Sequence, residues 1–270
     1  HGDIYPTIED IERAFRLMLR QIPASGHLLL CTDFPRAAAL REHAPCQVHT
    51  YGRGEDADYR IEITSNAATG TTYVLRYRGE SLGPCTITLA GEYNAVNAAA
   101  AIIAARLAGA DTQKAIAALP RFQGVKRRMD VFHEWNGVVF IDDFAHHPTA
   151  IRETVTGALA KYAGHRLIAC FEPRSNTTVT NHFQNDIAEA FRGADHVWFG
   201  PIHRAEKIQE SERLDRGALA RQIGPHAAYT DDVAEIVRWL RDNARPGDVV
   251  LCMSNGAFGG IYQKIREAFV

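Results

Sequence analysis

The segment Val138-Val139-Phe140-Ile141-Asp142-Asp143-Phe144-Ala145-His146-His147-Pro148-Thr149 decides the fold of this chain. An apolar run is followed by polar residues and then by a proline that suits the first turn of a helix, which is the order of a buried strand, a turn and a helix. In parallel sheets of this kind, ligands bind outside the carboxyl ends of the strands. The segment therefore predicts an α/β fold with two carboxylates and two imidazoles at a ligand-binding edge.

The alternation of strands and helices continues to the end of the chain. It predicts a Rossmann-like, doubly wound domain, because parallel strands joined by crossover helices build such a sheet. We place the domain boundary near Gly124, with an N-terminal domain at residues 1–124 and a C-terminal domain at 125–270. The strands predicted after 138–141 are 167–171, 196–199 and 249–253, and the predicted helices are 148–162, 180–191, 215–222, 233–242 and 260–269.

The N-terminal domain combines two patterns. An amphipathic helix at 7–19 with Thr7 as its N-cap precedes a strand, helix and strand that predict a parallel sheet. Alternating segments rich in β-branched residues then predict antiparallel edge strands. The parallel part comprises 26–32, 36–41 and 47–51; the edge strands are 59–64, 71–77 and 86–89, separated by Gly70, Gly79 and Gly83-Pro84; helices follow at 94–107 and 112–119.

Composition excludes several classes of partner. The 270 residues carry a formal net charge of −2, so no broad cationic field favours nucleic acid or an anionic membrane. The five cysteines are widely separated and form no Cys-x-x-Cys pair, which argues against a zinc cluster or a disulfide framework and favours a reducing cytoplasm. No apolar stretch approaches the roughly 18 residues of a membrane span. We expect a soluble, cytoplasmic protein.

Two asparagines open the predicted helix at 94–107. Asn94 and Asn97 are three residues apart and share one helix face, and an amide side chain both donates to and accepts from an adenine edge. An adenine contact is one interpretation. The alternative is that Asn94 serves only as the helix N-cap, whereas Asn97 inside the helix is harder to explain structurally.

A basic triplet, Lys126-Arg127-Arg128, lies at the predicted domain boundary. Arginine in this place suits bidentate contact with a phosphate. The alternative is a solvated charged face without a ligand.

The turn at 142–147 has several possible roles. One carboxylate could hold ribose hydroxyls while the other, or a histidine, fixes the turn. Metal binding by His146 and His147 is a rival interpretation, which the lack of an evident third ligand disfavours.

Two further polar segments directly follow apolar strands. In Glu172-Pro173-Arg174-Ser175-Asn176-Thr177-Thr178, Arg174 suits a substrate carboxylate, with Ser175 and Asn176 as its polar neighbours, although a simple polar loop is the alternative. The glycine-rich turn 253–260 offers backbone amides before a helix, an arrangement that favours an anion. The chain contains no Gly-x4-Gly-Lys-Ser/Thr loop for a nucleotide triphosphate.

The order of these motifs resembles that of the Mur ligases over essentially the whole chain. The motifs are His1-x-Asp-x-Tyr5, Gly91-Glu-x-Asn-x-x-Asn-Ala98, Gly124-Val-Lys-Arg-Arg128, Asp142-Asp-Phe-Ala-His-His-Pro-Thr-Ala-Ile151, Glu172-Pro-Arg-Ser-Asn-Thr177 and Met253-Ser-Asn-Gly-x-Phe-Gly-Gly260. The last three resemble the branch that joins a murein tripeptide to UDP-N-acetylmuramate. The resemblance implies the later part of a mononucleotide-binding ATPase domain, without its phosphate loop, followed by a Rossmann-like C-terminal domain.

The same resemblance implies an activity. It is ATP- and Mg²⁺-dependent amide ligation of L-alanyl-γ-D-glutamyl-meso-diaminopimelate to UDP-N-acetylmuramate through an acyl phosphate, in peptidoglycan recycling, with this stretch inactive by itself. Alternatives are the sister ligase for L-alanine, a folate or cyanophycin-type ligase, and a non-catalytic nucleotide-binding module. No nucleic acid or membrane partner is implied.

The resemblance also assigns roles to individual residues. Asn94 and Asn97 match an adenine-contacting pair, and Asp143 matches a ribose-binding carboxylate. Arg128 matches an arginine that meets the terminal phosphate and, with His147, is assigned to catalysis. His1 matches a magnesium-binding histidine. The residues assigned to the amine substrate are Arg174, Ser175, Asn176 and Asn255. Two departures from the family pattern are Tyr93, in place of a histidine, and Arg16, in place of a modified lysine.

Overall fold

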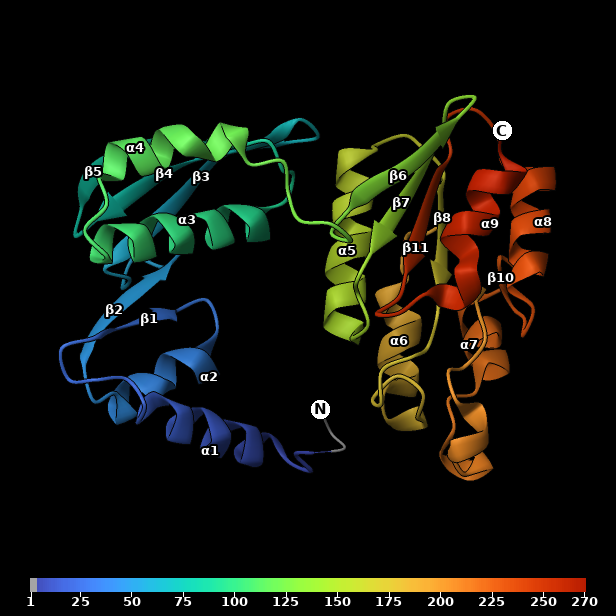
Figure 1. Cartoon of the computed structure of the whole chain (residues 1–270), viewed down its shortest axis with the longest axis horizontal. Coiled ribbons are helices and arrows are strands. Elements are labelled where there is room, and N and C mark those ends of the chain that lie inside the picture. The colour runs from blue at the N-terminus through green and yellow to red at the C-terminus, as the bar shows by residue number, and fades with distance from the viewer. Residues whose placement is uncertain (1–3) are drawn as a thin grey trace. The chain divides into compact units, whose positions relative to one another are not determined.

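The computed structural model describes residues 4–270, which divide into two compact units, 4–123 and 124–270 (Figure 1). The predicted residue His1 lies outside the described part of the chain. Within residues 4–270, no helix is both long enough and apolar enough to cross a membrane.

The N-terminal unit is a sheet with helices packed on it. The first helix, α1, starts as predicted, because Thr7 and Asp10 each accept a hydrogen bond from the other's backbone N–H in a capping box. Its elements are α1 (Ile8–Leu19), β1 (His27–Cys31), α2 (Pro35–Ala38) with a 3₁₀ turn at Ala39–His43, β2 (Gln47–Gly52), β3 (Tyr59–Ala67), β4 (Gly70–Tyr77), β5 (Glu80–Ile87), α3 (Glu92–Leu107) and α4 (Thr112–Ala118), followed by a 3₁₀ turn at Leu119–Arg121.

The sheet of this unit has the order β1-β2-β3-β4-β5. The pairs β1/β2 and β2/β3 are parallel, and β3/β4 and β4/β5 are antiparallel, which confirms the predicted change of pattern. The core lies between the antiparallel strands and α3, where Tyr73, Leu75 and Ile103 are fully buried. Burial of such side chains contributes on the order of 1.5–3 kcal/mol each.

Strand β5 is longer than predicted. We expected residues 86–89 with Gly83-Pro84 as a separator, but both residues lie inside the strand and pair with β4. Proline is tolerated there because β5 is the edge of the sheet, where one row of backbone N–H groups has no partner strand. The register also shifts between Leu75 and Arg76, a bulge that Gly83 accommodates with its positive φ of 124°.

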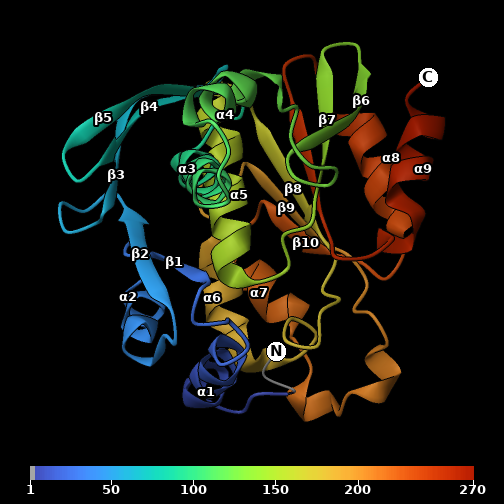
Figure 2. The ribbon, with the colours of Figure 1, turned by 60° about the vertical axis from the view of Figure 1, so that its left-hand side comes forward.

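The C-terminal unit is a doubly wound sheet, as predicted. Its order is β10-β9-β8-β11-β7-β6, with every neighbouring pair parallel except β6/β7. Helices α5, α6 and α7 cover one face and α8 and α9 the other (Figure 2). The elements are β6 (Asp130–Trp135), β7 (Val138–Asp143), α5 (Pro148–Lys161), β8 (Leu167–Phe171), α6 (Gln184–Ala190), β9 (His196–Phe199), α7 (Arg216–Ile223), β10 (Ala227–Tyr229), α8 (Val233–Asn243), β11 (Val249–Met253) and α9 (Ile261–Ala268), with 3₁₀ turns at Asn181–Phe183, Ala205–Lys207, Glu210–Glu212 and Phe258–Gly260.

Two edge strands of this sheet escaped prediction. Strand β10 has only three residues, and β6 mixes charged residues into its alternation, so neither gives a clear apolar run. Strand β6 matters for the site because it is antiparallel to β7 and pairs Asp130 with Asp142. It begins where β7 ends, and this brings the preceding basic triplet to the carboxyl edge of the sheet.

Candidate functional site

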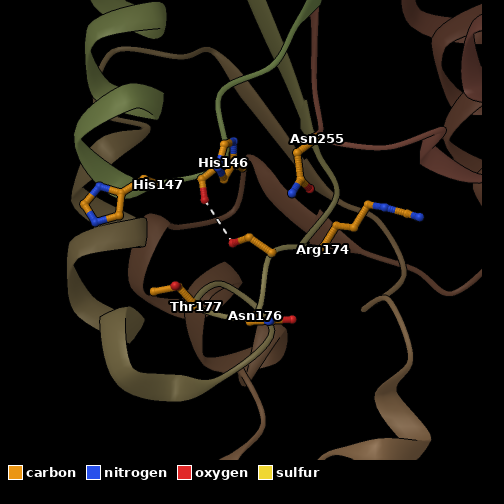
Figure 3. A pocket seen from close by; sticks show the side chains of 7 residues that line it. His146, His147, Arg174, Asn176, Thr177 and Asn255 are labelled. Carbon is orange, nitrogen blue, oxygen red and sulfur yellow. Dashed lines mark hydrogen bonds between the residues drawn. The ribbon is translucent and has the colours of Figure 1, made fainter. Parts of the chain in front are cut away.

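A pocket of about 430 Å³ lies at the carboxyl edge of the C-terminal sheet (Figure 3). Three loops line it, and they follow β7, β8 and β11, which are neighbours in the sheet. All four residues predicted to bind the amine substrate therefore line one pocket, together with both histidines of the β7 loop. The lining residues are His146, His147, Arg174, Ser175, Asn176, Thr177 and Asn255.

Ser175 holds the β8 loop in shape. Its hydroxyl donates to the carbonyl oxygen of His146 at 3.2 Å, the dashed contact in Figure 3, and lies 2.7 Å from the Thr178 hydroxyl. The backbone N–H of Thr178 donates to the same hydroxyl oxygen at 3.2 Å. Ser175 thus ties the β8 loop to the β7 loop, a positioning contact that its predicted role as a substrate ligand did not include.

Glu172 joins the β8 loop to the β11 loop, and sequence reasoning assigned it no separate role. Its carboxylate is 3% exposed and accepts from the Ser254 hydroxyl at 2.5 Å and from the Phe258 N–H at 3.1 Å. The Gly256 N–H donates to the Ser254 hydroxyl oxygen at 2.8 Å. The 253–260 turn was predicted to favour an anion, and in this structure its Ser254 hydroxyl and Phe258 N–H contact the chain's own Glu172 carboxylate.

Arg127 anchors the β11 loop from the opposite side. It donates from Nε to Asp142 at 3.1 Å and from Nη2 to the carbonyl oxygens of Ser254 at 2.5 Å and Gly256 at 2.9 Å. These carbonyls flank Asn255, whose Oδ1 is buried and has no hydrogen-bond partner among the described residues. A buried amide oxygen without a donor favours a ligand or water N–H or O–H group at this point of the pocket.

The structure separates the members of the basic triplet. Arg127 is half-buried, with a positive φ of 62°, whereas Arg128 is exposed. The guanidinium groups of both residues lie over the Phe144 ring, at 5.0 and 5.5 Å from its centroid. Of these two arginines, Arg128 is the one with a side chain open to a phosphate, and its assignment to the terminal phosphate stays a prediction.

Asp143 is a buried anchor in this structure. We expected it on the turn, but it ends β7, is 2% exposed, and accepts from the Met129 N–H at 2.9 Å, the Ala145 N–H at 2.8 Å and the Thr154 hydroxyl at 3.2 Å. Burial raises the pKa of the Asp143 carboxyl, and the two N–H donors oppose that rise. The carboxylate is closed to solvent in this structure, so contact with a ribose hydroxyl would require local rearrangement, and the assignment of Asp143 to ribose stays a prediction.

The two histidines of the β7 loop have separate partners. His146 places Nδ1 at 2.7 Å from the Phe144 carbonyl oxygen, and His147 is the N-cap of α5, where its Nδ1 accepts from the Thr149 N–H at 3.3 Å. In residues 4–270, no three His, Cys, Asp or Glu side chains gather so that they could hold a metal ion. The paired-histidine metal site therefore has no third ligand in the described part of the chain.

The capping role of His147 leads to a prediction on pH. Partial burial of the ring lowers the pKa of His147 below 6.5 in the folded protein. As the pH falls, this ring therefore takes up its proton at a higher pH in the unfolded chain than in the folded one. Its contribution to stability is present above about pH 6.5 and is lost below it. We expect His147→Asn, which caps without titrating, to reduce the fall in Tm between about pH 7 and about pH 5. Thermal unfolding at both pH values tests this, and equal falls in the two proteins would contradict it.

The predicted adenine-binding pair lies in the N-terminal unit. Helix α3 begins at Glu92 with Gly91 as its N-cap, so the interpretation of Asn94 as N-cap is wrong. Asn94 lies in the first turn and donates from Nδ2 to the Ala90 carbonyl oxygen at 2.8 Å, and Asn97 is exposed about one turn later. Their contact with adenine remains a prediction.

Comparison with known protein families accounts for most of the chain. Residues 1–105 match the Mur ligase middle domain, and residues 127–256 match the Mur ligase glutamate ligase domain. The chain belongs to the Mur ligase family. The second match contains every pocket residue of this Mur ligase chain, together with Arg128 and Asp143.

Individual relatives carry two different names. A UDP-N-acetylmuramate-L-alanyl-γ-D-glutamyl-meso-2,6-diaminoheptandioate ligase from Haemophilus influenzae is 34% identical over 270 residues, 99% of this chain and 57% of the relative. A UDP-N-acetylmuramate-L-alanine ligase from Desulforamulus reducens is 31% identical over 260 residues, 95% of this chain and 56% of the relative. The chain thus spans a little over half the length of these curated relatives.

Solved structures share the fold. A murein peptide ligase from Psychrobacter arcticus has a TM-score of 0.70 at 29% identity, covering 96% of this chain and 54% of its own. A UDP-N-acetylmuramate-alanine ligase from Thermotoga maritima has a TM-score of 0.77 at 20% identity, covering 99% of this chain and 56% of its own.

Proposed function

We propose that the protein carrying this chain is an ATP-dependent ligase that joins L-alanyl-γ-D-glutamyl-meso-diaminopimelate to UDP-N-acetylmuramate in peptidoglycan recycling. The pocket carries this proposal. Its volume of about 430 Å³ is in the range that holds drug-sized ligands, which suits a peptide better than a single small amino acid. The H. influenzae relative, similar over 99% of this chain, is named for this acceptor.

The pocket residues suit the acceptor peptide. Arg174 offers a guanidinium to a peptide carboxylate, and the unpaired Oδ1 of Asn255 accepts from a peptide N–H. His147 stands at the same pocket, and because its Nδ1 accepts from the Thr149 N–H, the neutral ring carries its proton on Nε2. We propose that this N–H group acts in catalysis as a donor to the acyl group under attack. Asn176 completes the lining beside Arg174.

The reaction we propose has two steps. The muramoyl carboxylate takes the terminal phosphoryl group of ATP, and the alanyl amine then attacks the acyl phosphate, so that phosphate leaves from a tetrahedral intermediate. Arg128 is placed to stabilise negative charge on the transferred group, and Asn94 and Asn97 are proposed to hold adenine. Asp143 would reach ribose after its turn rearranges.

Magnesium and the phosphate loop complete the proposal. Magnesium neutralises phosphate charge when it is bound, and it is usually held by phosphates, waters and one or two carboxylates. His1 is proposed as a ligand only on the family resemblance. We propose that the triphosphate-binding loop comes from outside these 270 residues and that this stretch alone is inactive. The free cysteines agree with a cytoplasmic location.

A second candidate is ligation of L-alanine, which the D. reducens relative favours by its name. The test measures phosphate release by the protein in full, with ATP, UDP-N-acetylmuramate and either tripeptide, L-alanine or no acceptor. Of these three conditions, we expect phosphate release only when the tripeptide is the acceptor. Release with L-alanine instead would transfer the assignment to the sister ligase, and no release with either acceptor would reject ligation.

A further inference from the structure

Arg174 is held by two side chains from different segments. Its Nη1 lies 3.1 Å from Nδ1 of His203, in the segment after β9, and 3.6 Å from Oε1 of Glu172. Figure 3 shows its side chain running away from His146 and His147 toward one end of the pocket. The guanidinium is therefore fixed at the pocket's edge, and neither partner had been singled out as a separate site residue from sequence.

The backbone enforces this arrangement. The His203 N–H donates to the Pro173 carbonyl oxygen at 2.9 Å, which pins the segment after β9 beside the β8 loop. Arg174 crosses the backbone of Gly256 so closely that a Cβ there would lie 2.0 Å from Nε. The contact between Arg174 and His203 is thus set by the course of three loops.

The contact also determines the protonation state of His203. A guanidinium has only donors, so Nδ1 of His203 must be the acceptor, and the ring must be neutral with its proton on Nε2. Arg174, Arg204, Glu172 and Glu206 are the charged groups that face it. Burial lowers the pKa of His203, the two arginines add to that effect, and the two glutamates oppose it.

We propose that His203 is a positioning residue, which in its neutral form holds Arg174 ready for a carboxylate of the acceptor and on protonation releases it. The identity of the acceptor rests on the proposed function, whereas the pairing of the two side chains does not. Since a protonated ring repels the guanidinium, affinity for the acceptor falls as the pH drops through the pKa of His203.

The first arm of the test uses the 270-residue chain and needs no activity. His203 is titrated by NMR in the wild type and in Arg174→Met, with His196 as an internal reference on a different strand end. We expect the pKa of His203 to rise in the variant because a neighbouring cation is removed, while His196 keeps its titration curve. An unchanged titration of His203 would overturn the pairing.

The second arm measures the steady-state kinetics of the full-length protein with the tripeptide as the varied substrate. His203→Leu removes the acceptor and is expected to raise KM for the tripeptide about tenfold, with little effect on KM for ATP. His203→Asn retains an acceptor oxygen, so it should restore KM and abolish its rise below about pH 6.5. The inference is refuted if His203→Leu leaves KM for the tripeptide unaltered. It is also refuted if KM of the wild type for the tripeptide decreases as the pH is lowered. A wild-type protein that ignores the tripeptide refutes the proposed function, and the NMR arm then still decides the pairing.

Discussion

Replacing Asp143 by alanine is expected to lower the free energy of unfolding of the C-terminal unit by about 3–5 kcal/mol. The substitution removes the acceptor of three donors, the N–H groups of Met129 and Ala145 and the hydroxyl of Thr154. Water cannot replace a carboxylate that is 2% exposed without opening the end of β7. Urea unfolding followed by tryptophan fluorescence measures this loss selectively, because all three tryptophans, Trp135, Trp198 and Trp239, belong to this unit.

Two controls separate the anchoring role of Asp143 from its charge. Asp143→Asn keeps one acceptor oxygen but turns an N–H₂ group toward one of the donors, so an intermediate loss is expected. Asp242→Ala, at an exposed position near the end of α8, should change the free energy of unfolding by no more than about 0.5 kcal/mol. A loss below about 1 kcal/mol in Asp143→Ala would show that the turn does not depend on this carboxylate.

Replacing Arg174 by alanine is expected to lower kcat/KM for the tripeptide about a hundredfold in the protein in full, if the proposed function is right. The variant removes the guanidinium that the pocket offers to a carboxylate and leaves Glu172 without its cationic neighbour. Arg174→Lys should recover only part of the loss, because an ammonium group lacks the planar fork that binds a carboxylate through two bonds. Steady-state kinetics with the tripeptide as varied substrate give both values.

Arg192→Ala is the matched control for charge. Arg192 lies just beyond α6, and its 82% exposed side chain pairs only with Glu189 among the described residues. Near-normal kinetics are expected for it, since exposed pairs of this kind contribute little. Wild-type kcat/KM in Arg174→Ala would remove this arginine from acceptor binding and leave its contacts purely structural.

The central strands of the C-terminal sheet were predictable because each is an apolar run bounded by turns. Residues 167–171, 196–199 and 249–253 form strands with those bounds. The edge strands were not predictable. Strand β6 is half-exposed and β10 has only three residues, so neither gives an apolar run. In the N-terminal unit, Pro84 is compatible with strand β5 only because β5 is an edge strand, and the sequence does not show which strands are edges.

The pocket was predictable to a similar degree. Polar residues after β7, β8 and β11 meet because the carboxyl ends of neighbouring parallel strands share one edge, which brings Arg174 and Asn255 together. The partners that hold those residues could not be predicted. Whether Arg127 or Arg128 turns inward depends on a backbone with positive φ, and the contact of His203 with Arg174 joins segments 29 residues apart.

The carboxylate of Glu172 has a consequence for where a nucleotide can go. A glycine-rich turn before a helix ordinarily binds a phosphoryl group. In the turn before α9, however, the Ser254 hydroxyl and the Phe258 N–H already donate to the carboxylate of Glu172, which carries the same sign of charge as a phosphate. We propose that an incoming phosphate is repelled there and that the exposed side chains of Lys126 and Arg128 supply its counter-charge instead. Two neighbouring loops at this end of the sheet therefore differ in charge: the 253–260 turn holds a negative side chain, and the segment before β6 exposes two positive ones.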